Sequence, residues 1–288
     1  MGLPGRLRKD DFGFSMPVDA PLYTPFPVHY RGCTMYIFTY VTDAAQAAAL
    51  LPEGCELTDV PIAQLVFARY PFSTVGTYNE VSQTLLCRYH GHVFTYAVRL
   101  HVDNPAAMCA GREIGGFPKK MGAIEFHSAD LETVSLVIPP NLNVCSAVID
   151  PLQPNDFLNQ TQVAQPQIPF VMDFLSLRVI PNPERPETPS LAQLIGTKWT
   201  LQGGEFFSAR GSIRLPDTAE INPYQQLPVV RALENPQYRP NPGDRDEERA
   251  QSRLTRNDVA DLPGFCLAPH MIFRGDMKVT EVKILQEL

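Results

Sequence analysis

The sequence predicts a mainly β protein of antiparallel strands with a few short helices. Six segments are rich in β-branched and aromatic residues, the composition typical of strands. Helix signals are short, and 28 prolines in 288 residues work against long helices, because proline lacks the backbone N–H and clashes with the preceding turn. A hydrophobic fraction of 44% with 19% charged residues fits a well-buried core, so we expect residues 1–288 to form a single domain.

The predicted strands occupy the middle of the chain and follow one another closely. Gly91 stands between two of them and suits a tight turn, which favours antiparallel pairing. The predicted strand ranges are 33–42, 61–70, 83–90, 92–102, 132–138 and 174–180.

Two short helices are predicted from their capping residues. Asp43 precedes an alanine-rich segment that Pro52 ends. Asn104 followed by Pro105 begins a second helix, which we expect to end near Gly111, just before a pair of lysines.

The charge balance excludes several classes of partner. A formal net charge of -7 and a pI of about 5.4 leave no basic field to attract nucleic acid or anionic lipid. No apolar run approaches the length of a membrane span, and the first residues lack the apolar core of a signal peptide. We therefore expect a cytoplasmic protein that binds neither nucleic acid nor membrane.

No metal site or disulfide framework is signalled. The six cysteines are scattered without a CxxC pair, and buried free thiols are the economical interpretation. His90 and His92 flank Gly91 without a third patterned ligand, so a hairpin tip is favoured over a metal site.

The stretch GREIGGFPKKMG, from Gly111 to Gly122, places Lys119 and Lys120 side by side. One interpretation is a solvated turn, where water screens both charges. The other is chemistry, because a cation held beside an amine makes that amine easier to deprotonate, and a neutral amine attacks carbonyls. Phe117 and the other apolar neighbours suit the second interpretation, but a pair of lysines by itself is more typical of a solvated turn.

This segment resembles the acetoacetate decarboxylase family, whose hallmark is Gly-Arg-Glu followed by an aromatic residue, a proline and two lysines. The residues that match the hallmark are Gly111, Arg112, Glu113, Phe117, Pro118, Lys119 and Lys120. Further matches are Asp103, Asn104, Gly76, Tyr78, Glu80, Gln83, Leu177, Ile180, Pro181, Asn182, Leu227, Pro228 and Val229. The resemblance covers the chain from about Tyr23 to the C-terminus.

The resemblance implies an antiparallel β-barrel or cone around an apolar cavity, and a lyase that needs no cofactor. The first lysine, matched by Lys119, would form a Schiff base with a β-keto acid, and the protonated imine would accept the electrons released as carbon dioxide leaves. Lys120 would help to keep Lys119 neutral; acetoacetate decarboxylase is itself a known example of such activation. The family is generally oligomeric, so a homo-oligomer is also expected.

Further pocket residues follow from the resemblance. Arg31 matches an arginine near the first strand and Glu80 matches a pocket glutamate, and both types of group can position a carboxylate or move protons. The alternatives are a surface strand position for Arg31 and a turn position for Glu80. We expect Phe117, Met121 and Leu65 to line the substrate pocket.

One departure from the family pattern concerns the substrate. Another pocket glutamate of the family falls in the predicted strand 61–70, where the aligned positions are Leu65 or Val66 and no carboxylate occurs. The more apolar pocket indicates a keto acid larger or more hydrophobic than acetoacetate. The alternatives are aldolase or dehydratase chemistry through the same imine, and a barrel that binds a small ligand without catalysis.

A second departure is an apparent insertion at about residues 235–265. A long irregular segment in a compact domain serves as a lid or an interface arm, or is a surface excursion.

Overall fold

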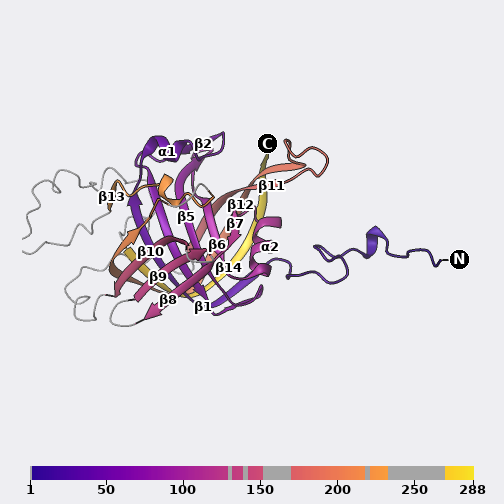
Figure 1. Ribbon diagram of the computed structural model, residues 1–288, viewed down its shortest axis with the longest axis horizontal. Coiled ribbons are helices and arrows are strands. Elements are labelled where there is room, and N and C mark those ends of the chain that lie inside the picture. The colour runs from indigo at the N-terminus through magenta and orange to yellow at the C-terminus, as the bar shows by residue number, and fades with distance from the viewer. Residues whose placement is uncertain (1, 129–131, 139–141, 152–169, 218–220, 233–269) are drawn as a thin grey trace, which may run out of the picture.

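The computed structural model describes residues 2–128, 132–138, 142–151, 170–217, 221–232 and 270–288. Its main feature is a closed barrel of seven strands (Figure 1). The strand order is β11-β6-β5-β3-β1-β14-β12, and β12 pairs back onto β11 to close the ring. The barrel strands are β1 (Val28–Val41), β3 (Ile62–Tyr70), β5 (Tyr78–Tyr89), β6 (His92–Val102), β11 (Phe170–Ile180), β12 (Leu191–Arg214) and β14 (His270–Glu287).

The seams of the barrel differ in strength. Neighbouring strands pair antiparallel over long registers, such as the eleven residue pairs between β11 and β12. The seam between β6 and β11 is parallel and has two registered pairs, Thr95 with Phe174 and Tyr96 with Leu175. Parallel pairing is slightly less stable per residue than antiparallel pairing, so this is the weakest seam of the wall.

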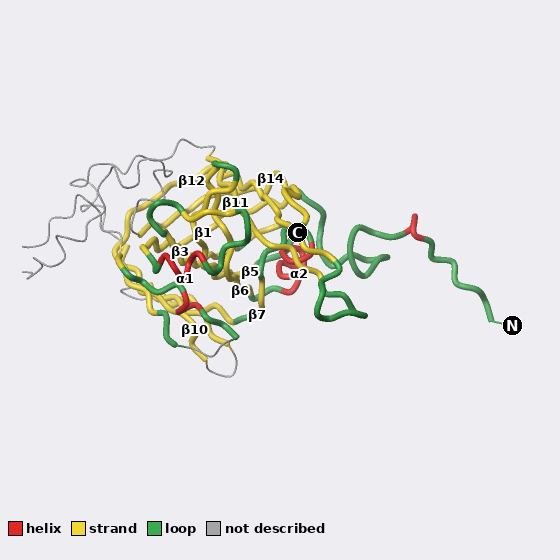
Figure 2. Tube along the Cα trace, turned by 90° about the horizontal axis from the view of Figure 1, so that it is seen from above, coloured by secondary structure: helices red, strands yellow, loops and turns green. Residues whose placement is uncertain are grey.

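A second layer of three strands covers part of the outside of the barrel (Figures 1 and 2). These strands extend the sheet from the distal half of β12, because β10 pairs with β12, β9 with β10, and β8 with β9. They are β8 (Ala123–Ser128), β9 (Glu132–Ile138) and β10 (Leu142–Pro151). The remaining short strands are β2 (Cys55–Leu57), β4 (Phe72–Ser73), β7 (Lys119–Met121) and β13 (Arg231–Ala232).

Alternation along the strands creates two apolar cores. The interior core lies inside the barrel and includes Tyr30, Met35 and Trp199, whereas the exterior core lies between the barrel wall and the second layer and includes Phe38 and Leu65. Successive strand residues point to opposite faces, so one strand supplies both cores. A one-residue difference in sequence therefore decides whether a side chain reaches the cavity.

The helices cap the barrel where the sequence predicts them. In α1 (Ala44–Ala48) the Asp43 carboxylate accepts a hydrogen bond from the Gln46 amide at 2.8 Å. In α2 (Pro105–Glu113) Asn104 accepts from the Ala107 amide at 3.1 Å. The second helix continues two residues beyond the predicted end at Gly111. Two short 3-10 turns, η1 (Lys9–Asp11) and η2 (Tyr224–Gln226), complete the described helical segments.

The predicted fold class, mainly antiparallel β with few short helices and a barrel, is confirmed. The strands expected at 61–70, 92–102 and 132–138 match β3, β6 and β9 to within one residue. None of the described helices has the length and apolar character needed to cross a bilayer. The apparent insertion at 235–265 lies outside the described residues.

Candidate active site

Lys119 reaches the barrel interior from a three-residue strand. β7 pairs in parallel with the end of β6, which sets Lys119 beside Leu100 and Lys120 beside His101. Because neighbouring strand residues face opposite sides, Lys119 points inward and is 5% exposed, whereas Lys120 points outward and is exposed. The strand thus separates the two lysines that the sequence places side by side.

The Lys119 ammonium group forms a buried ion pair with Glu80. Its Nζ lies 2.8 Å from Glu80 Oε2, and that oxygen has no hydrogen-bond donor elsewhere in the described part of the chain. The Nζ also lies 5.3 Å from the ring centre of Tyr78 and 5.9 Å from that of Phe117. Two opposite charges removed from water in this way are costly unless they are closely paired, so the pair is a candidate for chemistry.

Helix α2 holds the lysine in place from the other side. The Arg112 guanidinium donates a hydrogen bond from Nη1 to the Lys119 carbonyl oxygen at 3.0 Å. Gly111 lies directly against the lysine stem, because a Cβ at that position would be 2.6 Å from Lys119 Cδ. The Gly-Arg pair of the sequence hallmark therefore shapes the space around the lysine.

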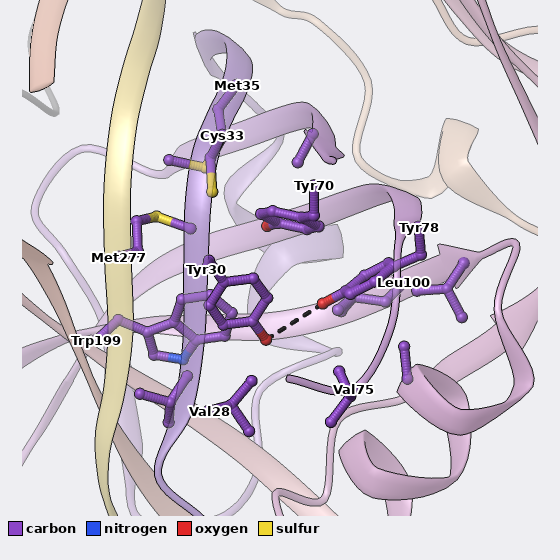
Figure 3. Close-up of a cluster of buried hydrophobic side chains, with 14 of the residues drawn as sticks. Val28, Tyr30, Cys33, Met35, Tyr70, Val75, Tyr78, Leu100, Trp199 and Met277 are labelled. Carbon is purple, nitrogen blue, oxygen red and sulfur yellow. Dashed lines mark hydrogen bonds between the residues drawn. The ribbon is translucent and has the colours of Figure 1, made fainter. Parts of the chain in front are cut away.

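Three buried tyrosines, Tyr30, Tyr70 and Tyr78, form a cluster in the barrel interior (Figure 3). The hydroxyls of Tyr30 and Tyr78 are 3.2 Å apart, and the ring of Tyr70 lies 4.9 and 4.7 Å from those two rings. Burial raises the pKa of each phenol well above its usual value, and the negative charge of Glu80 raises it further. The tyrosines therefore stay neutral and can only donate or share hydrogen bonds.

A cavity of about 760 Å³, partly open to solvent, extends from the ion pair along the barrel axis. Most of its wall is apolar, and Glu80 is the single carboxylate among the described residues that line it. The lining residues are Met35, Ile37, Gln64, Val66, Tyr70, Glu80, Ser82, Thr84, Thr95, Ala97, Leu100, Phe117, Lys119, Met172, Phe174 and Trp199. A smaller cavity of about 350 Å³ lies on the side of Lys119 that faces α2.

Lys120 contacts a different part of the molecule. Its Nζ donates to the carbonyl oxygen of Ile221 at 2.5 Å and lies 3.4 Å from Asn222 Oδ1. The same Asn222 oxygen is 3.1 Å from Nε2 of the buried His101, whose Nδ1 is 3.0 Å from the Tyr224 hydroxyl. The expectation that Lys120 lies beside the Lys119 amine is thus corrected: it fastens the segment around Asn222 to the outside of the barrel.

Arg31 does not reach the cavity. The pairing of β1 shifts register between Tyr30 and Cys33, where Gly32 adopts a positive φ of 63°. This bulge turns Tyr30 and Cys33 inward and leaves Arg31 exposed, with its guanidinium 5.7 Å from the ring centre of Phe72. The surface strand position considered from the sequence is the one observed.

The expected pocket residues divide according to strand alternation. Phe117 lines both cavities. Leu65 is fully buried in the exterior core, on the face of β3 opposite the cavity, and its neighbour Val66 lines the cavity instead. Met121 follows Lys120 at the end of β7 and is 43% exposed. The strand that should carry a second carboxylate presents Gln64 and Val66 to the cavity.

Sequence reasoning missed most of the aromatic wall. Trp199 stacks on Tyr30, with ring centres 5.5 Å apart and planes at 21°, and the ring centre of Phe174 lies 5.4 Å from that of Trp199. Period-two alternation in the segment around Trp199 is the sequence signal that indicates an inward-facing side chain at this position.

The described residues contain no candidate metal site. No cluster of three or more His, Cys, Asp or Glu side chains occurs among them. His90 has a positive φ of 49° beside Gly91 at a hairpin tip.

Comparisons with known proteins agree with this architecture. A model of the acetoacetate decarboxylase family matches residues 15–239. Decarboxylase DEC1 of Cochliobolus heterostrophus is 26% identical over 81% of this chain and 92% of its own length. An acetoacetate decarboxylase of Chromobacterium violaceum is 30% identical over 76% of this chain and 87% of its own.

Solved structures show the same fold at low sequence identity. Acetoacetate decarboxylase from Legionella pneumophila superposes with a TM-score of 0.70 at 22% identity, covering 100% of this chain and 99% of that one. The enduracididine biosynthesis enzyme MppR, complexed with the condensation product of pyruvate and imidazole 4-carboxaldehyde, superposes with a TM-score of 0.62 at 17% identity. These two comparisons cover 98% of this chain or more.

Proposed function

This chain belongs to the acetoacetate decarboxylase family and is a carboxy-lyase of that type, and we propose that it decarboxylates a β-keto acid through an imine on Lys119. The observation that carries the proposal is the buried ion pair of Lys119 and Glu80 at 2.8 Å, placed at the base of an apolar cavity. The reaction needs no cofactor.

The first step is the release of a neutral amine. A proton moves from Lys119 Nζ to Glu80 Oε2 across the short contact, which leaves two uncharged groups in a site that water does not reach freely. The amine nitrogen then attacks the ketone carbon of the substrate, and Glu80 returns its proton as the carbinolamine loses water. Glu80 thus serves as the proton carrier of the site.

The second step breaks the bond to the carboxylate. The electron pair of that bond moves into the protonated imine, carbon dioxide leaves, and an enamine forms. Protonation of the enamine carbon and hydrolysis of the resulting imine release the ketone product and the Lys119 amine. No cationic side chain other than Lys119 lines the described wall of the cavity, so the substrate carboxylate has no charged anchor there, which favours its loss.

The extent and lining of the cavity support the proposal that the substrate is larger than acetoacetate. The lining residues run along β3 from Tyr70 to Gln64 and along β5 from Glu80 to Thr84, so the cavity continues well beyond the ion pair. Val66 and Gln64 occupy the position of the absent carboxylate, so the wall beyond Glu80 is uncharged. We therefore place a longer, more apolar acyl chain in this space.

Borohydride trapping tests the imine directly. The intact mass of the protein is measured after borohydride reduction in the presence of a β-keto acid, and the modified peptide is mapped. We expect one adduct on Lys119 and none in Lys119→Ala. Lys198 is the matched control in the peptide map, because it forms a similar but more exposed ion pair with Glu281 at 3.2 Å. We expect no adduct on Lys198. Absence of an adduct on Lys119 in the wild type would exclude the mechanism.

Release of carbon dioxide separates the alternatives. An aldolase or dehydratase working through the same imine would give the Lys119 adduct without releasing carbon dioxide from a β-keto acid. A barrel that only binds a small ligand would give neither, and ligand binding would survive in Lys119→Ala. Adduct and carbon dioxide together are the result we expect.

We also propose that the single domain assembles into a homo-oligomer in the cytoplasm. Large apolar side chains are exposed on the two barrel strands that flank β12, with Val171 and Val179 on β11 and Ile284 on β14 at 45%, 50% and 54% exposure. Contact between copies would bury such side chains. Sedimentation velocity of the full chain measures the assembly, and a monomer at micromolar concentration would contradict it.

A further inference from the structure

The end of the cavity farthest from Lys119 is polar. Gln64, Thr84 and Thr95 lie there on the adjacent strands β3, β5 and β6, with Ser82 one step nearer the lysine. Gln64 and Thr84 are direct cross-strand partners, so their Cβ atoms are about 5 Å apart. We call these four side chains the polar belt. An apolar acyl chain cannot form hydrogen bonds with them, so a ligand that fills this end of the cavity is expected to carry a polar group.

Thr84 has the clearest unmet hydrogen-bonding capacity. Its side chain is 2% exposed and lines the cavity, and its Oγ1 has no hydrogen-bond partner within the described residues. Gln64 is held in place because its Nε2 donates to Thr39 Oγ1 at 3.2 Å. A buried hydroxyl without a partner is unfavourable, so a ligand oxygen placed here would be favoured over a methylene group.

The distance from the reacting amine sets the position of that oxygen on the substrate. Glu80, which contacts the amine, and Thr84 are four residues apart on β5, a separation of about 13 Å at roughly 3.3 Å per residue. An extended chain covers about 3.3–3.6 Å per three bonds, so on the order of ten bonds separate the ketone carbon from the belt. Acetoacetate is far too short to span this gap.

We propose that the substrate is a β-keto acid of on the order of twelve carbons with a second oxygen function, a hydroxyl or a carbonyl, near its far end, which forms a hydrogen bond with Thr84. This inference rests on the proposed function for the role of Lys119 and names the substrate class for that site. Thr84 is then the residue that determines specificity at the distal end.

Binding can be measured without turnover because Trp199 is the sole tryptophan of the chain and lines the cavity. The probes are the methyl ketone left by decarboxylation of a straight twelve-carbon β-keto acid, and the same ketone with a hydroxyl on its terminal carbon, which places that oxygen about ten bonds from the ketone carbon. Fluorescence titration gives the Kd of each, and the ratio of the two Kd values reports recognition of the distal oxygen. Failure of both ketones to change the fluorescence would overturn the proposal.

We expect Thr84→Val to lower that preference about tenfold, the value of one net hydrogen bond, and Thr84→Ser to keep it. Thr42→Val is the matched control, because Thr42 is equally buried and its Oγ1 also has no partner among the described residues, but it does not line the cavity. An unchanged preference in Thr84→Val would overturn the proposal.

Lys119→Ala separates this inference from the proposed function. The variant should keep the preference for the hydroxylated ketone, since recognition by Thr84 does not require the imine. If the wild-type protein shows the preference but gives no borohydride adduct, the imine mechanism is removed and, with it, the assignment of the ligand as a substrate. A preference lost in Thr84→Val while the adduct still forms on Lys119 is the outcome that supports both.

Discussion

Lys119 and Lys120 are neighbours in the chain but serve opposite sides of the barrel wall. The first places its Nζ 2.8 Å from a buried glutamate, and the second donates to the carbonyl oxygen of Ile221 on the outside. A β-strand enforces this separation, because adjacent side chains point to opposite faces. The environment of the Lys119 amine is therefore set by Glu80, the aromatic wall and burial.

Lys120→Ala should leave imine formation on Lys119 intact and weaken the fold. Loss of the hydrogen bond to Ile221 should lower the free energy of unfolding by about 1 kcal/mol, measured by denaturant titration. The pH dependence of borohydride trapping should match that of the wild type, because the Lys120 charge faces solvent. A shift of the trapping profile by one pH unit or more would show direct activation instead.

Glu80→Gln should lower kcat by at least about a hundredfold, since the amide keeps the shape of the side chain but cannot accept the lysine proton. Steady-state kinetics on a β-keto acid measures the loss. Arg31→Ala is the control from the same set of expected pocket residues, and it should keep wild-type kcat because Arg31 is exposed on the outer face of β1. Equal losses in the two variants would contradict the placement of both residues.

Gly111→Ala should separate activity from stability. The added Cβ would lie 2.6 Å from Lys119 Cδ and 2.7 Å from Cε, so the lysine must move away from Glu80, and a misplacement of about 1 Å can cost a hundredfold in rate. Alanine is favoured over glycine inside a helix by up to about 1 kcal/mol, which offsets part of the cost of loosening the buried ion pair, so activity should fall far more than the melting temperature. Gly203→Ala, with open space around the new methyl group, should keep full activity.

His101 should make the protein less stable in mild acid. Burial lowers the pKa of His101 to about 4, with a further lowering from the Lys120 charge, although the bond to Asn222 opposes the shift. Between that pKa and the unfolded value near 6.5, the unfolded chain binds more protons, so stability is present above pH 6.5 and is lost as the pH falls toward 4. The full loss is about 3 kcal/mol.

Denaturant titrations across this pH range measure the effect. His101→Gln, which keeps hydrogen-bonding capacity without a titrating ring, should reduce the slope of stability against pH. The same slope in both proteins would show that other groups carry the acid sensitivity.

Local patterns in the sequence are enough to predict most individual elements of this fold. Asp43 and Asn104 act as helix caps as their residue types suggest, and the strand ending at Tyr70 begins one residue from its predicted start. The closure of the barrel depends on pairs such as Phe174 with Thr95, which are far apart in the chain. Such pairings are set by tertiary packing, which no local pattern records.

Only part of the candidate site could be predicted, again because pairing between distant strands leaves no local pattern in the sequence. Lys119, Glu80 and Phe117 meet around one cavity, as the family resemblance implies. The prediction that Leu65 lines the cavity is wrong by one position, because Leu65 lies on the opposite face of its strand. A single bulge at Gly32 turns Arg31 outward. Strand alternation could have predicted that adjacent lysines diverge, whereas the position of a bulge is decided by pairing with a distant strand.

The short parallel seam between β6 and β11 gives the barrel a preferred line of opening. A wall joined by two residue pairs separates at a lower free energy than walls joined along their whole length, so hydrogen exchange should be fastest there among the barrel seams. Thr95 and Phe174 belong both to this seam and to the cavity lining. Opening of this seam would therefore expose the distal end of the cavity through the side of the barrel.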